Sequence, residues 1–352
     1  MQIKLLLRAL KETIYSCPGY IIAMAAILIL IGTMPALNIY FTSQFISLFD
    51  NQTPSASPKI LLILWGLSML IPNLLTPLVE YIQANINQLL TGKITFRLME
   101  KSSSFKSLET YDIGEVQNTI EVLSSESQHR PTNFAVNIVM VSREIIAIIS
   151  ISYMLYSALW WAPILLLVSA IPLAIINFKV TEYSWQALMD VGQHSRMLRY
   201  LSNLTFHREA QKEVHLFKAF DLISSKYTSS FNVIHEKLKS SQKKILAYPI
   251  PFQLISVLGT GSLLYILYLH SSSSSLTTAS VVIIFQSILL LNGRLETLII
   301  HSSLLIEIMD YFKKYFSFID FKEAMQDGEI DISKIETIEF KNVIFMNRNK
   351  NY

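Results

Sequence analysis

The sequence has little of what most soluble proteins are built from: one cysteine, few charges, and long stretches with no charge at all. Lysine, arginine, aspartate and glutamate make up 16% of the 352 residues, whereas an average soluble domain has about 25%. The hydrophobic fraction of 51% and the mean hydropathy of +0.40 therefore indicate a membrane protein. The net charge of +3 is too small to suggest nucleic acid as a partner.

Several kinds of chemical site are absent from the sequence. Its single cysteine, Cys17, excludes a disulfide framework within one chain and a zinc cluster. The histidines are scattered and show no His-Glu-x-x-His pattern, and no Gly-x-x-x-x-Gly-Lys-Ser/Thr phosphate-binding loop is present. No acidic residue can be assigned to Mg²⁺ or to a catalytic base. We therefore expect no catalytic residue, no metal and no cofactor in this chain, and no ATP hydrolysis by this chain alone.

Uncharged runs are what the sequence has in abundance, and they predict six membrane spans. About 20 apolar residues cross a bilayer, so the runs at 13–49 and 60–79 hold one span each. The run at 145–178 is divided by a predicted tight turn at Trp160–Pro163, because tryptophan favours the membrane interface. The run at 245–293 is divided by the serines at 271–275. These two runs therefore hold two spans each.

Basic residues predict the orientation of these spans. Lysine and arginine are frequent at 80–144 and 179–244, whereas the loops around Asn51, Trp161 and Ser273 offer only Lys59 at an edge. Short loops that are rich in lysine and arginine stay in the cytoplasm. We therefore expect a multi-pass protein of the plasma (cytoplasmic) membrane with both termini in the cytoplasm.

The first segment and the two polar regions are predicted to be helical. Lys4, Arg8 and Lys11 alternate with apolar residues at helical spacing, which indicates an amphipathic helix lying on the cytoplasmic membrane surface over residues 1–17. The polar regions at 80–144 and 179–244 lack the glycine and proline of flexible linkers. As helical hairpins, their arms of about thirty residues would each reach about 45 Å.

Two stretches in these polar regions resemble the coupling loops of ATP-binding cassette (ABC) exporters. The first contains Tyr111, Asp112, Gly114 and Glu115, where Asp112 could cap a short helix and Glu115 would favour its positive end. The second runs from Arg199 to Phe217. Its candidate residues are Arg199, Tyr200, Arg208, Glu209, Lys212 and Glu213. The resemblance implies that each loop carries a short helix touching a motor domain, and that the run 212–217 opens the next long helix.

The tail resembles the same family. Residues 335–345 alternate like a strand and look like the first strand of an ABC nucleotide-binding domain, although Asn347 stands where the family usually has an aromatic residue. The resemblance implies an all-α six-span transmembrane domain over 18–321, a linker over 322–335, and the start of a truncated nucleotide-binding domain over 336–352. ATP and Mg²⁺ would bind in the nucleotide-binding domain that this chain lacks.

Polar residues in or beside the spans serve either to line a substrate path or to bond neighbouring helices. Asn292, Arg294 and Glu296 follow the sixth span closely. An ionisable residue at membrane depth is a functional candidate, so these three residues form a possible translocation path. A position at the inner membrane boundary is the alternative, and it is the one we favour from the sequence.

The family resemblance implies an exporter permease that works with a second transmembrane domain, as a homo- or heterodimer, and with a nucleotide-binding domain. It would move a peptide or lipid-like substrate outward by alternating access, and the spacing of the second loop favours a peptide. Two alternatives remain: a motor-free, proton-driven peptide permease, and a non-transporting membrane sensor or assembly subunit. The uncharged spans argue against the first, and the lack of a recognisable signalling domain argues against the second.

Overall fold

The described residues of the computed structural model form helices joined by short turns. They are 2–50, 57–105, 119–120, 122–124, 126–127, 129–273 and 277–321, with Thr337 and Glu339. The elements are α1 (Gln2–Ser16), α2 (Pro18–Ile46), the 3₁₀ helix η1 (Ser47–Asp50), α3 (Pro58–Ser103), α6 (Arg130–Ala158), α7 (Ala162–Asp190), α8 (Gly192–Phe206), α9 (Arg208–Leu216), α10 (Phe220–Ala247), α11 (Pro249–Ser273) and α12 (Thr278–Ile319).

Six helical segments of this part of the chain are long and apolar enough to cross a membrane, as the uncharged runs predict. They are Pro18–Ile46, Pro58–Ser103, Arg130–Ala158, Ala162–Tyr183, Phe220–Ile266 and Thr278–Ile319. The predicted tight turn is present, because α6 ends at Ala158 and α7 begins at Ala162. Prolines lie inside α2 and α3 without ending them, since neighbouring groups in a membrane bundle satisfy the freed carbonyls.

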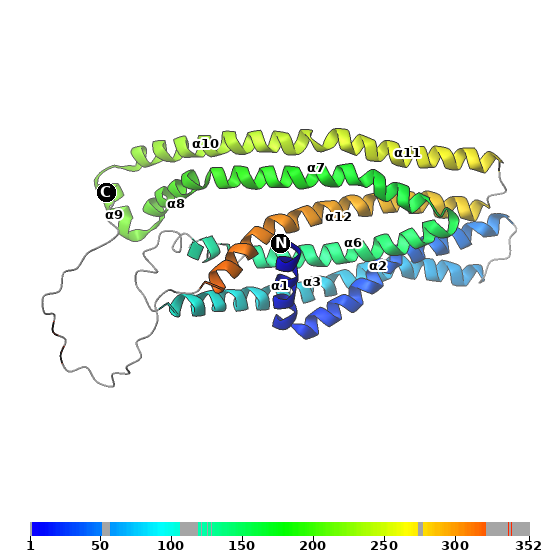
Figure 1. Cartoon of the computed structure of the whole chain (residues 1–352), viewed down its shortest axis with the longest axis horizontal. Coiled ribbons are helices and arrows are strands. Elements are labelled where there is room, and N and C mark those ends of the chain that lie inside the picture. Colours follow the sequence, from blue (N-terminus) through cyan, green and yellow to red (C-terminus); the bar gives the residue numbers. More distant parts are fainter. Residues whose placement is uncertain are drawn as a thin grey trace.

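The long helices run side by side along the longest axis of the molecule (Figure 1). The last turns of α2, α6 and α11 and the first turns of α3, α7 and α12 gather at one end, and α8 and α9 lie at the opposite end (Figure 1). α1 crosses the bundle instead of following it. The molecule therefore has two different ends. One end is built from the ends of the spans, and at the other end polar helices extend beyond the apolar segments.

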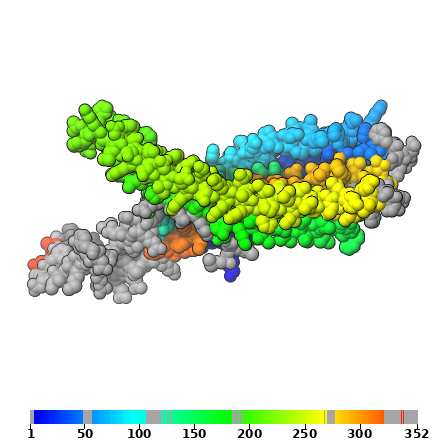
Figure 2. All heavy atoms as spheres, turned by 90° about the horizontal axis from the view of Figure 1, so that it is seen from above, coloured from blue at the N-terminus to red at the C-terminus, as the bar shows by residue number. Residues whose placement is uncertain are grey.

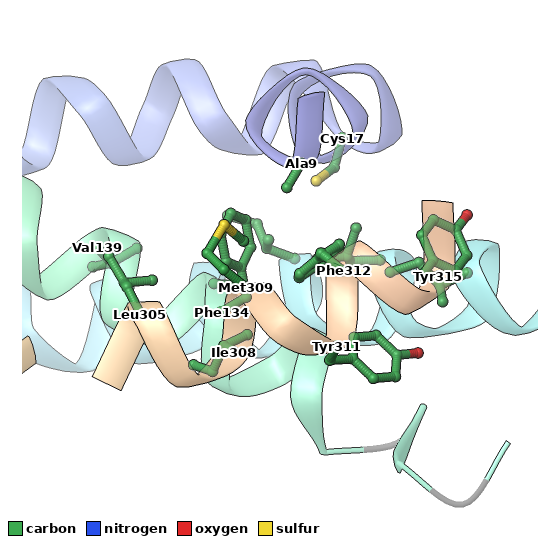
Figure 3. Close-up of a cluster of buried hydrophobic side chains, with 14 of the residues drawn as sticks. Ala9, Cys17, Phe134, Val139, Leu305, Ile308, Met309, Tyr311, Phe312 and Tyr315 are labelled. Carbon is green, nitrogen blue, oxygen red and sulfur yellow. The ribbon is translucent and has the colours of Figure 1, made fainter. Parts of the chain in front are cut away.

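Two clusters of buried apolar side chains hold the bundle together. The first joins α1, α2, α3, α6 and the second half of α12, and Phe134, Phe312 and Tyr315 are among its fully buried members. Figure 3 shows Ala9 and Cys17 facing this cluster from the N-terminal segment. The second cluster joins α2, α6, α7, α11 and the first half of α12. α12 therefore belongs to both clusters.

Helix α1 is tied to the bundle by two ion pairs. Arg8 donates to both carboxylate oxygens of Asp320, at 2.5 and 2.7 Å, just beyond the end of α12. Arg97 of α3 donates to Glu12. The hydrogen bond from Arg8 lowers the pKa of Asp320 below its ordinary value, and the same bond raises the pKa of Arg8. The N-terminal segment is thereby linked directly to the C-terminal end of the last span.

Some predictions concern residues that the structure does not describe. The first loop residues Tyr111, Asp112, Gly114 and Glu115, the linker, and the strand at 335–345 apart from Thr337 and Glu339 lie outside the described residues. They remain predictions, as do the domain boundaries and the helical hairpins.

Candidate functional site

A group of charged and amide side chains lies between α6 and the last two spans. At its centre is Glu144, whose side chain is completely buried. Its carboxylate accepts hydrogen bonds from Arg143 at 2.7 Å and from Arg294 of α12 at 3.3 Å. The side chains of Arg143 and Arg294 are each about one third exposed. The buried carboxylate is therefore shared by two arginines that also face outward.

Three further hydrogen bonds extend this group along α12. Ser256 of α11 donates to the Asn292 amide oxygen at 3.0 Å, and Gln253 donates to Glu296 at 3.0 Å. One turn beyond, the ring Nδ1 of His301 lies 2.8 Å from the amide oxygen of Asn137 on α6. We call these residues the polar belt: Asn137, Arg143, Glu144, Gln253, Ser256, Asn292, Arg294, Glu296 and His301.

The length of the helices places part of the polar belt at membrane depth. Only fourteen residues separate Glu144 from the end of α6 at Ala158, which is about 21 Å at 1.5 Å per residue. A hydrocarbon core of about 30 Å therefore extends past Glu144. By the same measure Arg294 lies about 24 Å along α12 from Thr278. The charged groups at 143, 144 and 294 thus lie within candidate spans, away from the end of the bundle where α6 meets α7.

The three predicted residues lie on α12 and contact two different helices. Arg294 is bonded to α6, whereas Asn292 and Glu296 are bonded to α11. All three residues are hydrogen-bonded to neighbouring helices, and α12 continues beyond them to Ile319. The boundary position that the sequence favours stays a prediction. Sequence reasoning missed Glu144, because it is the last charged residue before the uncharged run that begins at 145 and was counted with the polar region. The signal was present: fourteen residues from 145 to 158 are too few for a span.

Such an arrangement can hold together three spans and offer polar groups to a passing molecule. Breaking a buried ion pair at membrane depth is costly, so α6 and α12 are held in register here. The exposed parts of Arg143 and Arg294 can also donate hydrogen bonds to a ligand. This is consistent with either role considered for the three α12 residues.

The second candidate site is the far end formed by α8, α9 and α10. Helix α9 has no buried residue. Arg199 and Tyr200 lie on α8, whereas Arg208, Glu209, Lys212 and Glu213 lie on α9, and all six side chains are exposed. A groove runs along this end, lined by Thr205, Arg208, Gln211, Lys212, Val214, His215, Leu216, Lys218, Phe220 and Asp221.

The connection from α9 to α10 corrects one expectation. The run 212–217 does not open the next long helix, because α9 ends at Leu216 and α10 starts at Phe220. Ala219 N–H donates to Val214 C=O at 2.9 Å and Lys218 N–H to His215 C=O at 3.3 Å, the pattern of a Schellman helix end. Lys218 takes the left-handed conformation, with φ of 48°, that glycine usually occupies at this position.

Large apolar side chains are exposed at this end even though the helices here are polar. Leu216 is 77% exposed and Phe217 is 74% exposed, and Phe206, Phe220 and Leu222 are exposed as well. Figure 2 shows the α8–α10 end diverging from the C-terminal half of α12. We call Phe206, Leu216, Phe217, Phe220 and Leu222 the tip patch. An exposed apolar patch on polar helices is typical of a protein-binding surface.

Comparison with known proteins gives the family context. No family model matches the chain. It is 20% identical over 331 residues to the "subtilin transport ATP-binding protein SpaT" of Bacillus subtilis, which covers 92% of this chain and 53% of that protein. Over most of its length the chain is thus similar to an ABC transporter protein. It is also 21% identical over 262 residues to the "ATP-dependent lipid A-core flippase" of Photorhabdus laumondii, which covers 72% of this chain and 44% of that protein.

The chain spans about half the length of these two relatives. Its six apolar helices fit the transmembrane domain of an ABC exporter. The first relative is named as an ATP-binding transport protein and the second as an ATP-dependent flippase.

Proposed function

We propose that this chain is the membrane-spanning permease part of an ATP-driven ABC exporter, which moves a peptide or lipid-like substrate out of the cytoplasm by alternating access. The observation that carries the proposal is the combination of six membrane-capable helices with a polar end that exposes large apolar side chains. Lipid can cover exposed apolar surface on the spans, but it cannot cover the tip patch if that end projects into water. A protein partner is the remaining way to bury it.

In this proposal the tip patch and helix α9 receive the nucleotide-binding domain. Closure of two such domains on ATP would push α9, and α8 and α10 would carry the movement into α7 and α11. Alternating access then follows from a two-state equilibrium that the motor biases. A second transmembrane domain, from the same or another chain, would complete the pathway, and both termini would face the cytoplasm.

The polar belt is the proposed substrate path. Asn292, Arg294 and Glu296 lie on α12, where the exposed parts of their side chains are available to a peptide or a polar lipid headgroup. The first coupling stretch, residues 111–115, would have the same role as α9 toward the nucleotide-binding domain. ATP and Mg²⁺ would be held by the nucleotide-binding domain, and this chain would contribute no catalytic residue.

The test uses the protein isolated from its native membranes with the nucleotide-binding domain that accompanies it, returned to inside-out vesicles. We expect ATP-dependent uptake of peptide and substrate-stimulated ATP hydrolysis. Replacing Lys212 and Leu216 with alanine should abolish both while leaving substrate binding intact, because α9 transmits movement and does not contact substrate. Lys226→Ala, an exposed lysine on α10 outside the groove, is the matched control. Full activity of the double variant would contradict the assignment of α9.

A motor-free, proton-driven permease gains one specific observation. The argument from uncharged spans fails, because Glu144, Glu296 and His301 lie on helices that are long and apolar enough to cross the membrane. The same vesicles distinguish the two functions. Uptake driven by a proton gradient in the absence of nucleotide would establish the motor-free permease, whereas dependence on ATP without a gradient would exclude it.

A further inference from the structure

An apolar cavity of about 310 Å³ lies between the N-terminal helix and three of the spans. Leu10 and Ile14 of α1, Ala25 and Ile29 of α2, Ile86 of α3, and Ile146 of α6 are on its wall. The polar belt lies on another face of α6. Residues 135, 138, 142 and 146 follow helical spacing toward the cavity, whereas Asn137 and Glu144 contact α12.

The lining of this cavity favours hydrocarbon over water. Among the described residues on its wall, only Thr13, Gln83 and Ser142 are polar, and the Thr13 hydroxyl already donates to Ala9 C=O at 2.9 Å. A buried water needs two to four polar partners, and an apolar cavity of about 150 Å³ stays dry and binds benzene. A cavity of twice that size has room for a segment of an acyl chain.

The cavity opens toward lipid and is closed at its other end. Ile14, Ala25 and Ile29 on its wall are exposed, and they belong to the apolar surface of α2 and α1. One turn beyond Ile29, Gly32 packs so closely on α6 that an added Cβ would come within 2.6 Å of Ile146. An occupant therefore enters from the membrane near α1 and ends at the Gly32–Ile146 contact.

Positive charges lie near the open end. Lys11 is exposed on α1, one turn before Ile14 and on the same side of the helix. Lys93 lies on α3 one turn before Arg97 and on the same side of the helix, and Arg97 donates to Glu12 of α1. Lys93 also opposes the rise that burial causes in the pKa of the Cys17 thiol, at the corner between α1 and α2. Basic groups beside an interfacial helix attract anionic lipid headgroups.

We propose that this cavity is a binding site for one acyl chain of an anionic phospholipid, whose phosphate lies against Lys11 and Lys93. The acyl chain fills the space between α1 and the spans, and the headgroup stays at the level of the amphipathic helix. Because α1 also holds Asp320 through Arg8, the bound lipid would steady the end of α12. This site is independent of the proposed substrate path.

The experiment uses the whole chain in phosphatidylcholine vesicles that contain a small fraction of phosphatidylglycerol with a photoreactive diazirine in one acyl chain. After irradiation, mass spectrometry of the digested protein locates the labelled residues. We expect labels on the segments 10–29 and 135–146. Ala25→Trp should reduce this labelling about fivefold, because the indole occupies the space of the acyl chain. Ala26→Trp is the matched control, since Ala26 is also exposed on α2 but does not line the cavity.

The headgroup is tested with Lys11→Gln combined with Lys93→Gln, and Lys226→Gln is the control. We expect the double variant to lose the preference for labelled phosphatidylglycerol over labelled phosphatidylcholine, and the control to keep it. Ala25→Leu provides a smaller replacement if Ala25→Trp does not fold. Undiminished labelling in a folded Ala25 variant would overturn the cavity as the site. Equal labelling by the two lipids in the unaltered protein would overturn the anionic headgroup.

Discussion

Helices α12 and α10 are both long, but they are stabilised in different ways. The 42 residues of α12 include fifteen that are buried, and the helix contributes to both apolar clusters. In the 28 residues of α10 only Ser241 is buried. The stability of α12 therefore comes from contacts within the chain. α10 depends on its neighbours α7 and α8 and, in our proposal, on a protein at its tip.

Because of this difference, functional residues are of different types in the two regions. In the packed region, a functional group must be a polar one that the packing tolerates, such as Glu144 with its two arginines. At the exposed end, the apolar residues are the informative ones, because exposing apolar surface to water is unfavourable in free energy. The same residue type thus has opposite meanings in the two regions, and substitutions can test this directly.

The largest effect is expected from removing an aromatic ring in the packed region. Phe312 is fully buried against Phe134, with ring centroids 4.8 Å apart. Phe312→Ala should lower the free energy of unfolding by about 3–5 kcal/mol through lost contacts and a cavity. Phe220→Ala at the tip patch should change it by less than about 0.5 kcal/mol. Unfolding titrations in mixed micelles measure both, and equal losses would contradict the comparison.

Ion pairs give a second contrast. Glu144→Gln leaves two arginines facing an uncharged amide and should cost about 3 kcal/mol or more. Glu236 pairs with Lys239 at 3.8 Å on the exposed face of α10, and both side chains are largely exposed. Glu236→Gln should therefore cost less than about 0.5 kcal/mol. The same unfolding titrations apply, and a small effect at Glu144 would show that its arginines find other partners.

A substitution at the end of α9 should be stabilising, unlike the substitutions described above. Lys218→Gly should stabilise the helix end by about 1 kcal/mol, since glycine adopts the left-handed conformation without strain. Hydrogen exchange of the amides of Lys218 and Ala219, which close the helix end, should slow accordingly. Lys226→Gly within α10 should instead speed local exchange, because glycine costs about 1 kcal/mol inside a helix.

The smallest effect concerns pH and the pair of Arg8 and Asp320. Because the pKa of Asp320 is lowered by Arg8, the pair stabilises the folded state at neutral pH. That contribution is lost as the pH falls below the ordinary carboxyl value of 3.8 and through the lowered pKa. Both side chains are about half exposed, so the contribution should stay below about 1 kcal/mol. Asp320→Asn should remove it, and the pH dependence of α1 hydrogen exchange measures this.

The spans could be predicted from the sequence because lipid requires long uncharged runs, and the turn at Trp160–Pro163 followed from the same requirement. The partner of Glu144 could not, because Arg294 lies 150 residues away in the sequence and nothing local brings α12 beside α6. The end of α9 was misplaced for a different reason. It depends on the left-handed conformation of Lys218, and a lysine gives no local signal for that conformation.

Helix α1 also acts as a mechanical connection. It is joined to α3 through Glu12 and to the end of α12 through Arg8, while its basic and apolar faces suit the membrane surface. Any tilt of α12 must therefore drag α1 through the headgroup layer or break the Asp320 pair. Membrane tension and lipid viscosity would then oppose the movement of the last span, so the rate of a conformational cycle would depend on the fluidity of the surrounding bilayer.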